Sequence, residues 1–443
     1  MTSSTPPDSA EQVFGRESEY LINTYPRLPL VVDRGQGVYL WDTDGRRYLD
    51  LMSGLGVSAL GHAHPRLVAA LTSQASQVLH LSNLYSHRCQ GELAEKLCHL
   101  SGMSAAFFST GGAEAVEGAL KLARSWAQQN FLQGQSQSKT GFVALEQSYH
   151  GRSFGALSVT GQPRYRESFG PALTGVRFAR RNDVASLDAV MDESICAIIV
   201  EPIMGEGGVH ECSDGFLREA RRLADQHHAL LIFDEIQCGL GRTGSWFAFE
   251  KSGVRPDVLV IGKPLGGGLP LSAFLVAPGK NLRRTLTAGQ HGSTLGGSPI
   301  ACRLALEFLA IVEEEALLEQ IRDTGVHLSK GLTRLLADST VATQSRGTGL
   351  LQALELSMPV RPIVEQGLAK GLLLNSVQGN ILRFLPPYLL EKSHVDEAME
   401  QLDSLLAAVE PQTSAGEITA HVPCPPRDLP SNDALSSAPA IVS

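Results

Sequence analysis

Short apolar runs alternate with segments of helical periodicity through the middle of the chain. The runs with the length and composition of buried strands are AAFF at 105–108, FVAL at 142–145, ICAIIV at 195–200, ALLIF at 229–233 and VLVI at 258–261. Apolar residues at helical spacing lie between them, as in AEAVEGALKLARSWAQQ (113–129) and GFLREARRLADQHH (215–228). This alternation predicts an α/β fold with a mostly parallel sheet covered by helices on both faces. Ligands bind such sheets beyond the carboxyl ends of the strands.

The pattern changes near residue 300. Residues 300–336 have the spacing of one long amphipathic helix, and strand-like pieces follow at 350–356 (LLQALEL) and 380–387 (NILRFLPP). These elements predict a second, α+β unit. The last thirty or so residues are rich in Pro, Ser and Ala without periodicity, which predicts a disordered tail.

Composition and charge exclude several classes of function. The 443 residues are 43% hydrophobic and 19% charged, as in soluble globular proteins. A net charge of −9 without a basic block disfavours nucleic acid as a partner. No run reaches the roughly 18 apolar residues that cross a membrane, and the first residues carry no secretory signal. Seven scattered cysteines without a C-x-x-C pair indicate a reduced, cytoplasmic setting.

A lone lysine, Lys263, follows the apolar run VLVIG, and Pro264 and three glycines come soon after it. Burying an ammonium group costs free energy, and clustered glycines let a ligand approach the backbone. A lysine whose pKa is lowered by burial and a cationic neighbour can act as a Schiff-base nucleophile. A surface lysine that opens a flexible turn is the alternative.

Asp234 and Gln237 follow the preceding apolar run. A carboxylate at a strand end can hold the protonated ring nitrogen of a heterocyclic cofactor, and the amide could donate to a ring oxygen. The alternative is a magnesium site, but no G-x-x-x-x-G-K-[ST] phosphate loop accompanies it. In a parallel sheet Asp234 and Lys263 would share one edge. The pair His62 and His64 lacks a third ligand in spacing, so we expect no metal site.

Three further segments add groups at strand ends. The turn after 105–108, Ser109 to Gly112, opens a helix whose free N–H groups suit a phosphate, although an ordinary capped helix has the same pattern. Tyr149 could stack on a planar ring or be a loop aromatic. Arg383, in an apolar strand, suits a substrate carboxylate or a structural salt bridge. Together these groups meet the needs of pyridoxal 5′-phosphate acting on an amino acid.

The sequence resembles the class III, fold-type I aminotransferases, and among them the acetylornithine aminotransferases. The resemblance covers residues 17–410. Its motifs include LGHAHP, SNLYSH, STGGAEAVEGALKLAR, YHGRSFGALSVTGQPRY, EPIMGEGG, FDEIQCGLGRTGSWFAFE, GKPLGGGLP, HGSTLGGSP and NILRFLPP. Val116 and Pro264 depart from the residues common in the family, without removing a reacting group.

The resemblance implies a cofactor site for pyridoxal 5′-phosphate. Lys263 would form the Schiff base and later shuttle a proton, and Asp234 would keep the ring nitrogen protonated. Gln237 would contact the ring hydroxyl, and Tyr149 would stack on the ring. The residues expected to hold the phosphate are Thr110, Gly111, Gly112 and Ala113, with Thr294 reaching it from the partner subunit of an obligate homodimer.

The resemblance also implies a substrate site. Arg383 would bind the α-carboxylate of glutamate and Arg152 its distal carboxylate, with Tyr25 as a further substrate-binding residue. Glu206 matches the family's switch residue, which pairs with the arginine in one half-reaction and swings aside in the other. Leu55 stands where ornithine aminotransferases have tyrosine, and an apolar residue there fits an N-acylated substrate.

The expected reaction moves the 5-amino group of N²-acetylornithine to 2-oxoglutarate in arginine biosynthesis. The alternatives are another ω-amine donor (succinylornithine, N-succinyl-diaminopimelate, ornithine or 4-aminobutyrate) or a non-catalytic ligand-binding relative. The expected organisation has disordered residues at 1–14 and 411–443 and an N-terminal segment at 15–50 that packs with the small domain. We expect a large cofactor-binding domain at 51–294, which contains a sheet of the seven-stranded type. A small α+β domain is expected at 295–410.

Overall fold

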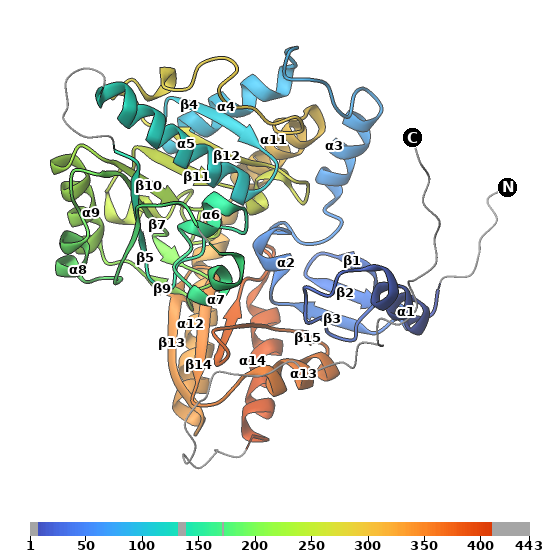
Figure 1. Ribbon diagram of the computed structural model, residues 1–443. Coiled ribbons are helices and arrows are strands. Elements are labelled where there is room, and N and C mark those ends of the chain that lie inside the picture. The colour runs from blue at the N-terminus through green and yellow to red at the C-terminus, as the bar shows by residue number, and fades with distance from the viewer. Residues whose placement is uncertain (1–7, 132–138, 171, 410–443) are drawn as a thin grey trace, which may run out of the picture. The chain divides into compact units, whose positions relative to one another are not determined.

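The computed structural model describes residues 8–131, 139–170 and 172–409 (Figure 1). The tail expected at 411–443 and the first seven residues lie outside these ranges. No helix of the described residues is long and apolar enough to cross a membrane.

A sheet of seven strands forms the middle of the molecule. Its order is β4 (Ala105–Ser109), β12 (Ser272–Val276), β11 (Val258–Ile261), β10 (Leu230–Asp234), β7 (Ile195–Val200), β5 (Gly141–Leu145) and β6 (Val176–Ala179). The strands β11, β10, β7, β5 and β6 pair in parallel, whereas β12 is antiparallel to both its neighbours. The prediction of a mostly parallel sheet is confirmed, and β6 and β12 are additions to the five expected strands.

Helices cover both faces of this sheet, as predicted. Alternate residues of β10 point to opposite sides: Leu230 and Ile232 belong to the apolar cluster of α5 (Gly112–Phe131), which crosses the strands in Figure 1. Leu231 and Phe233 belong to the cluster of α9 (Asp214–Gln226). Further helices around the sheet are α3 (Pro65–Ala75), α4 (Arg88–Ser101), α6 (Phe154–Ser158), α7 (Pro163–Arg166), α8 (Val184–Ala189) and α10 (Phe249–Ser252).

Two smaller sheets are built from the two ends of the chain. One has the order β1 (Val32–Gln36), β2 (Tyr39–Asp42), β3 (Arg47–Asp50) and β15 (Leu372–Leu373). The other has the order β13 (Ala342–Thr348), β14 (Leu351–Leu356), β17 (Ile381–Phe384) and β16 (Asn375–Val377). Because β15 pairs with β3, the segment before residue 50 is bonded to the C-terminal part of the chain. The domain boundaries themselves stay a prediction.

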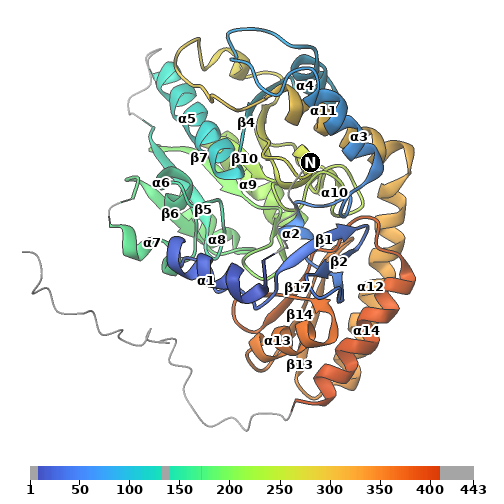
Figure 2. The ribbon, with the colours of Figure 1, turned by 90° about the vertical axis from the view of Figure 1, so that its right-hand side faces the viewer.

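The single long helix expected at 300–336 is wrong, because two helices occupy this range. They are α11 (Pro299–Glu314) and α12 (Leu317–Asp338), and Ala316 between them has a left-handed backbone with φ 52°. The chain turns here because α11 packs on α3 and α4, whereas α12 packs on β13 and on α14 (Lys392–Ala407), beside α13 (Arg361–Lys370) (Figure 2). Tertiary packing overrides the continuous helical periodicity.

The range 1–14, for which we expect disorder, includes the start of a helix at Ala10. Helix α1 (Ala10–Tyr20) begins there, although none of its residues is buried. A capping box explains its start: Ser9 accepts from the amide of Gln12, and the Gln12 side chain accepts from the amide of Ser9.

Candidate active site

Asp234 and Lys263 stand at the same edge of the large sheet, as expected. Asp234 is the last residue of β10 and is paired with Val260 of the parallel strand β11. Lys263 follows β11 and opens the short helix η2 (Lys263–Gly266) with a left-handed φ of 44°. Such a backbone is unusual for lysine, and strain of this kind concentrates at functional sites. Pro264 lies in the first turn of η2, where its missing N–H has no cost.

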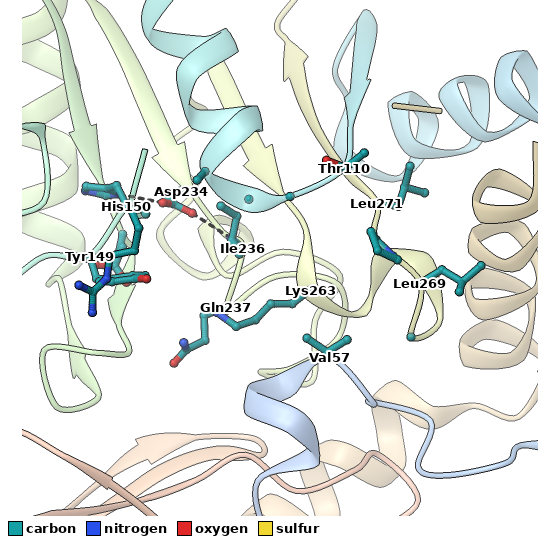
Figure 3. Close-up of a pocket in the computed structure, with 18 residues that line it drawn as sticks. Val57, Thr110, Tyr149, His150, Asp234, Ile236, Gln237, Lys263, Leu269 and Leu271 are labelled. Atoms are coloured by element: carbon teal, nitrogen blue, oxygen red, sulfur yellow. Dashed lines mark hydrogen bonds and ion pairs between the residues drawn. The ribbon is translucent and has the colours of Figure 1, made fainter. Parts of the chain in front are cut away.

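A cavity of about 480 Å³ opens beyond these strand ends (Figure 3). Nine of the predicted site residues line it: Thr110, Gly111, Gly112, Ala113, Tyr149, Arg152, Asp234, Gln237 and Lys263. Its volume is of the size that holds a cofactor with a substrate. The cavity is also lined by residues that were not predicted from the sequence to bind a ligand, among them Val57, His150 and Glu201.

The start of α5 forms one end of the cavity. The amide and hydroxyl of Thr110 donate to the Glu114 carboxylate, 2.8 and 2.7 Å away. The amides of Gly112 and Ala113 make no hydrogen bond within the described residues. A Cβ at Gly111 would meet nothing within 4 Å, so space is open above this turn. The turn therefore offers both a capped helix and free donors for an anion.

Asp234 is held rigidly at the back of the cavity, where it is 4% exposed. One carboxylate oxygen accepts from the amide of Ile236 at 3.1 Å, and the other lies 2.7 Å from His150 Nδ1 (Figure 3). The buried Nε2 of His150 has no partner among the described residues. Both contacts fix the carboxylate in position. Sequence reasoning missed the contact of His150 with Asp234, because the loop that carries His150 is remote from Asp234 along the chain.

The amine of Lys263 makes no hydrogen bond or ion pair with any residue in the described ranges, although the residue is half-buried and lines the cavity. Burial lowers the pKa of this amine, and the Arg383 charge lowers it further while Glu206 opposes the shift. A lowered pKa raises the share of the neutral amine, which is the nucleophilic form. The lysine is thus suited to attack a carbonyl carbon in the cavity.

Arg383 on β17 is 1% exposed and lies just behind the cavity wall. Its Nη1 donates to Glu206 Oε1 at 2.6 Å and to Gln237 Oε1 at 3.0 Å, and its Nε donates to Asn375 Oδ1 at 2.9 Å. Although burial opposes it, the ion pair holds the pKa of Glu206 below its usual range. The predicted arginine and the predicted switch carboxylate therefore lie together, and Gln237 links them to the cavity.

Arg152, Tyr25 and Thr294 are exposed residues of the predicted site. Arg152 is exposed, with its guanidinium 3.8 Å from the ring centre of Tyr165 and 5.7 Å from that of Tyr149. Tyr25 is 67% exposed, and neither it nor the exposed Thr294 lines the cavity. Their roles toward substrate and toward a partner subunit stay predictions.

The groups present fit pyridoxal 5′-phosphate. Free amides at the start of α5 suit its phosphate, the fixed carboxylate of Asp234 suits its ring nitrogen, and the unpaired amine of Lys263 suits its aldehyde. The magnesium alternative finds no support in residue grouping. Within the ranges 8–131, 139–170 and 172–409, no three His, Cys, Asp or Glu side chains are gathered as metal ligands.

Comparison with known proteins places most of the chain in one family. The family model described as Aminotransferase class-III matches residues 20–406. The acetylornithine aminotransferase of Aquifex aeolicus is 41% identical over 388 residues, which are 87% of this chain and 100% of that protein. The acetylornithine aminotransferase of Methanocaldococcus jannaschii is 37% identical over 401 residues, 90% of this chain and 99% of that protein.

Solved structures resemble the chain over the same range. The ornithine aminotransferase of Toxoplasma gondii ME49 has a TM-score of 0.86 and 31% identity, covering 91% of this chain and 96% of that one. The acetylornithine aminotransferase of Elizabethkingia anophelis has a TM-score of 0.79 and 31% identity, covering 90% of this chain and 100% of that one.

Proposed function

The chain belongs to the class-III aminotransferases, fold-type I enzymes that depend on pyridoxal 5′-phosphate, and from this premise we propose its reaction. It transfers the 5-amino group of N²-acetylornithine to 2-oxoglutarate, which gives N-acetylglutamate 5-semialdehyde and glutamate, a step of arginine biosynthesis. The names of the relatives support this donor. The observation that carries the proposal is the buried ion pair of Arg383 and Glu206 beside the cavity.

This pair solves a problem that two different substrates pose. In glutamate the carbon that bears the reacting amine also bears a carboxylate. In acetylornithine the carbon that bears the terminal amine has no charged group in the place of that carboxylate. Arg383 can bind the carboxylate of glutamate, and Glu206 can neutralise the guanidinium when the other donor is bound. An unpaired buried guanidinium would otherwise be costly. Glu206 keeps 22% of its side chain exposed, which leaves it room to turn away.

When bound, pyridoxal 5′-phosphate supplies an electron sink for negative charge on the substrate carbon. Lys263 holds the cofactor through its amine and, once displaced, moves a proton at that carbon with the same Nζ atom. Asp234, fixed by Ile236 and His150, holds the proton on the ring nitrogen. The amides of Gly112 and Ala113 bind the phosphate.

Tyr149 and Gln237 both line the cavity, where Tyr149 would stack on the ring of the cofactor and Gln237 would contact its hydroxyl. Arg152 binds the distal carboxylate of glutamate from its exposed place near Tyr149. Both half-reactions would thus use one set of groups.

Ornithine is the second candidate donor, because ornithine aminotransferases are among the solved structures that the fold resembles. Leu55 favours the acylated donor over ornithine. It lies in α2 (Ser53–Gly56) with a left-handed φ of 62°, is 41% exposed, and precedes the cavity residue Val57 by two positions. An apolar side chain there suits an acetyl group and offers nothing to a charged α-amine.

A homodimer with shared active sites is also part of the proposal. Leu84 and Tyr85 are 88% and 71% exposed, and Leu295 is 56% exposed next to Thr294. Apolar side chains gathered in this way mark surfaces that bind a partner. Asn83 ties the two segments together, because its Nδ2 donates to Ser293 O at 3.1 Å and to Gly296 O at 3.0 Å. A partner on this surface would receive Thr294 at its own phosphate site.

The cytoplasm is the proposed location. All six cysteines in the described residues are free thiols, as a reducing compartment favours.

A panel of amine donors tests the proposed reaction. Purified enzyme loaded with cofactor is assayed with N²-acetylornithine, succinylornithine, N-succinyl-diaminopimelate, ornithine and 4-aminobutyrate, each with 2-oxoglutarate and with pyruvate. We expect the highest kcat/KM for N²-acetylornithine with 2-oxoglutarate. A higher kcat/KM for ornithine would show that ornithine, and not N²-acetylornithine, is the donor. Cofactor binding without amino transfer from any of the amines would show that the chain is a non-catalytic relative.

A further inference from the structure

Glu201 is a buried carboxylate on the cavity wall for which the reaction described above has no use. It follows the last residue of β7, is 5% exposed, and lines the same cavity as Asp234 and Lys263. No lysine or arginine of the described residues pairs with it. Burying an unpaired carboxylate costs stability unless its oxygens accept hydrogen bonds. The two bonds that it accepts therefore indicate what it does.

Both bonds come from the backbone of loops that carry site residues. Glu201 Oε1 accepts from the amide of Tyr149 at 2.8 Å, and Oε2 accepts from the amide of Gly205 at 3.3 Å. Tyr149 lies in the loop after β5, and Gly205 immediately precedes Glu206 in the turn after β8 (Ile203–Met204). One carboxylate thus joins the loop of the stacking ring to the turn of the switch residue.

The turn of Glu206 is also held from its other sides. Gln378 Nε2 donates to the carbonyl of Glu206 at 2.5 Å. A Cβ at Gly205 would come within 1.7 Å of Gln237 Oε1, so the turn packs directly against the residue that contacts Arg383. With its backbone fixed at these points, Glu206 can leave Arg383 by turning its side chain while the turn stays in place.

We propose that Glu201 is a positioning residue that holds the backbones of Tyr149 and Gly205 at a fixed separation during both half-reactions. The loop of Tyr149 and the backbone of the turn that carries Glu206 then keep their relative places when the Glu206 side chain turns away from Arg383. The inference rests on the proposed function, because it takes Glu206 to alternate between two positions. A carboxylate suits this task, since both of its oxygens accept, whereas an amide would present its NH₂ group to one of the two N–H donors.

Glu235 offers a matched control. It is also fully buried, and its two oxygens accept from the amides of Ala248 and Phe249, both at 2.7 Å. It does not line the cavity. Each of the variants Glu201→Gln and Glu235→Gln therefore removes a hydrogen bond from a backbone amide to a buried side-chain oxygen. The bond is lost at the cavity wall in Glu201→Gln and at the start of α10 in Glu235→Gln.

The holoenzyme of each variant is compared with the wild type in three measurements. These are kcat/KM for N²-acetylornithine, kcat/KM for glutamate in the reverse half-reaction, and the visible circular dichroism of the bound cofactor, which reports the ring's surroundings without turnover. Thermal unfolding is recorded alongside. One charge-assisted hydrogen bond corresponds to about tenfold or more in an equilibrium constant.

In Glu201→Gln we expect the ratio of the two kcat/KM values to change about tenfold and the visible dichroism band to change with it. In Glu235→Gln we expect both quantities to stay at their wild-type values. Wild-type values of the ratio and the band in Glu201→Gln would overturn the inference. If Glu201→Gln does not fold, Glu201→Asp replaces it, since it keeps both oxygens but withdraws them by one methylene. A wild-type ratio in a folded Glu201→Asp would equally overturn it. Failure of the wild type to use either donor would instead refute the proposed function.

Discussion

Replacing Glu206 by glutamine leaves Arg383 without its anionic partner and tests the role of this ion pair. The bond between them is charge-assisted and short, 2.6 Å from Nη1 to Oε1, at a guanidinium that is 1% exposed. Hydrogen bonds to charged groups contribute about 1.5–3 kcal/mol net, which corresponds to about 10- to 150-fold in an equilibrium constant. Arg383 keeps its bonds to Gln237 and Asn375 in the variant, so we expect folded enzyme.

The expected effect has opposite signs for the two donors. In Glu206→Gln the guanidinium is always free to bind the carboxylate of glutamate, so KM for glutamate falls. The terminal amine of acetylornithine then approaches an uncompensated positive charge, so its kcat/KM falls. The ratio of the two kcat/KM values should shift toward glutamate by about 10- to 150-fold.

Single-turnover absorbance of the cofactor band measures each half-reaction separately and keeps product release out of the comparison. Asn375→Ala serves as a control, because it removes a neutral acceptor from Arg383 and leaves the ion pair in place. An unchanged ratio in Glu206→Gln, or a shift toward acetylornithine, would refute the reasoning.

Three further predictions concern other parts of the structure. Gly205→Ala would place a Cβ 1.7 Å from Gln237 Oε1, and overpacking of about 1–3 kcal/mol should lower kcat/KM for both donors about tenfold; wild-type steady-state kinetics would contradict this. Burial raises the pKa of Glu235 to about 8, so the folded protein keeps a proton there that the unfolded chain releases from about pH 4.5 upward. Stability from this group is full below about pH 4.5 and is lost as pH rises to about 8, and thermal scans of Glu235→Gln should lack that decline; parallel declines in both proteins would contradict it. Asn83→Ala removes the bond that Asn83 accepts from Gln90 and the two that it donates to Ser293 and Gly296, which order the exposed surface around Thr294 and contribute about 1 kcal/mol each. It should weaken the dimer in sedimentation velocity at least about tenfold, and an unchanged dissociation constant would place the interface elsewhere.

The sequence was most informative where a residue's position follows from its own strand. Asp234 and Lys263 each follow an apolar run, and parallel pairing of those runs brings them to one edge without further information. Strand β6 was missed because a charged residue breaks its apolar run, which reads VRFA at the sheet edge. Strand β12 was missed although AFLV at 273–276 is as long as the runs AAFF, FVAL and VLVI of the expected strands.

Contacts between distant segments were beyond the sequence. The bond between His150 and Asp234 joins a loop to the end of β10, and nothing in either segment marks the other as its partner. Glu201 looks like an ordinary strand-end carboxylate until the amides of Tyr149 and Gly205 are seen to converge on it. The pairing of Arg383 with Glu206 came from family resemblance, since the arginine's own surroundings left a structural salt bridge equally open.

The most direct test of the central claim is to trap the group that holds the cofactor. The holoenzyme is reduced with borohydride and digested, and the modified peptide is identified by mass spectrometry. The account predicts that the yellow absorbance is lost and that the reduced cofactor is bonded to Lys263, while Lys263→Ala shows neither fixation nor turnover. A cofactor fixed to another lysine, or a Lys263→Ala protein that transfers amino groups at the wild-type rate, would contradict it.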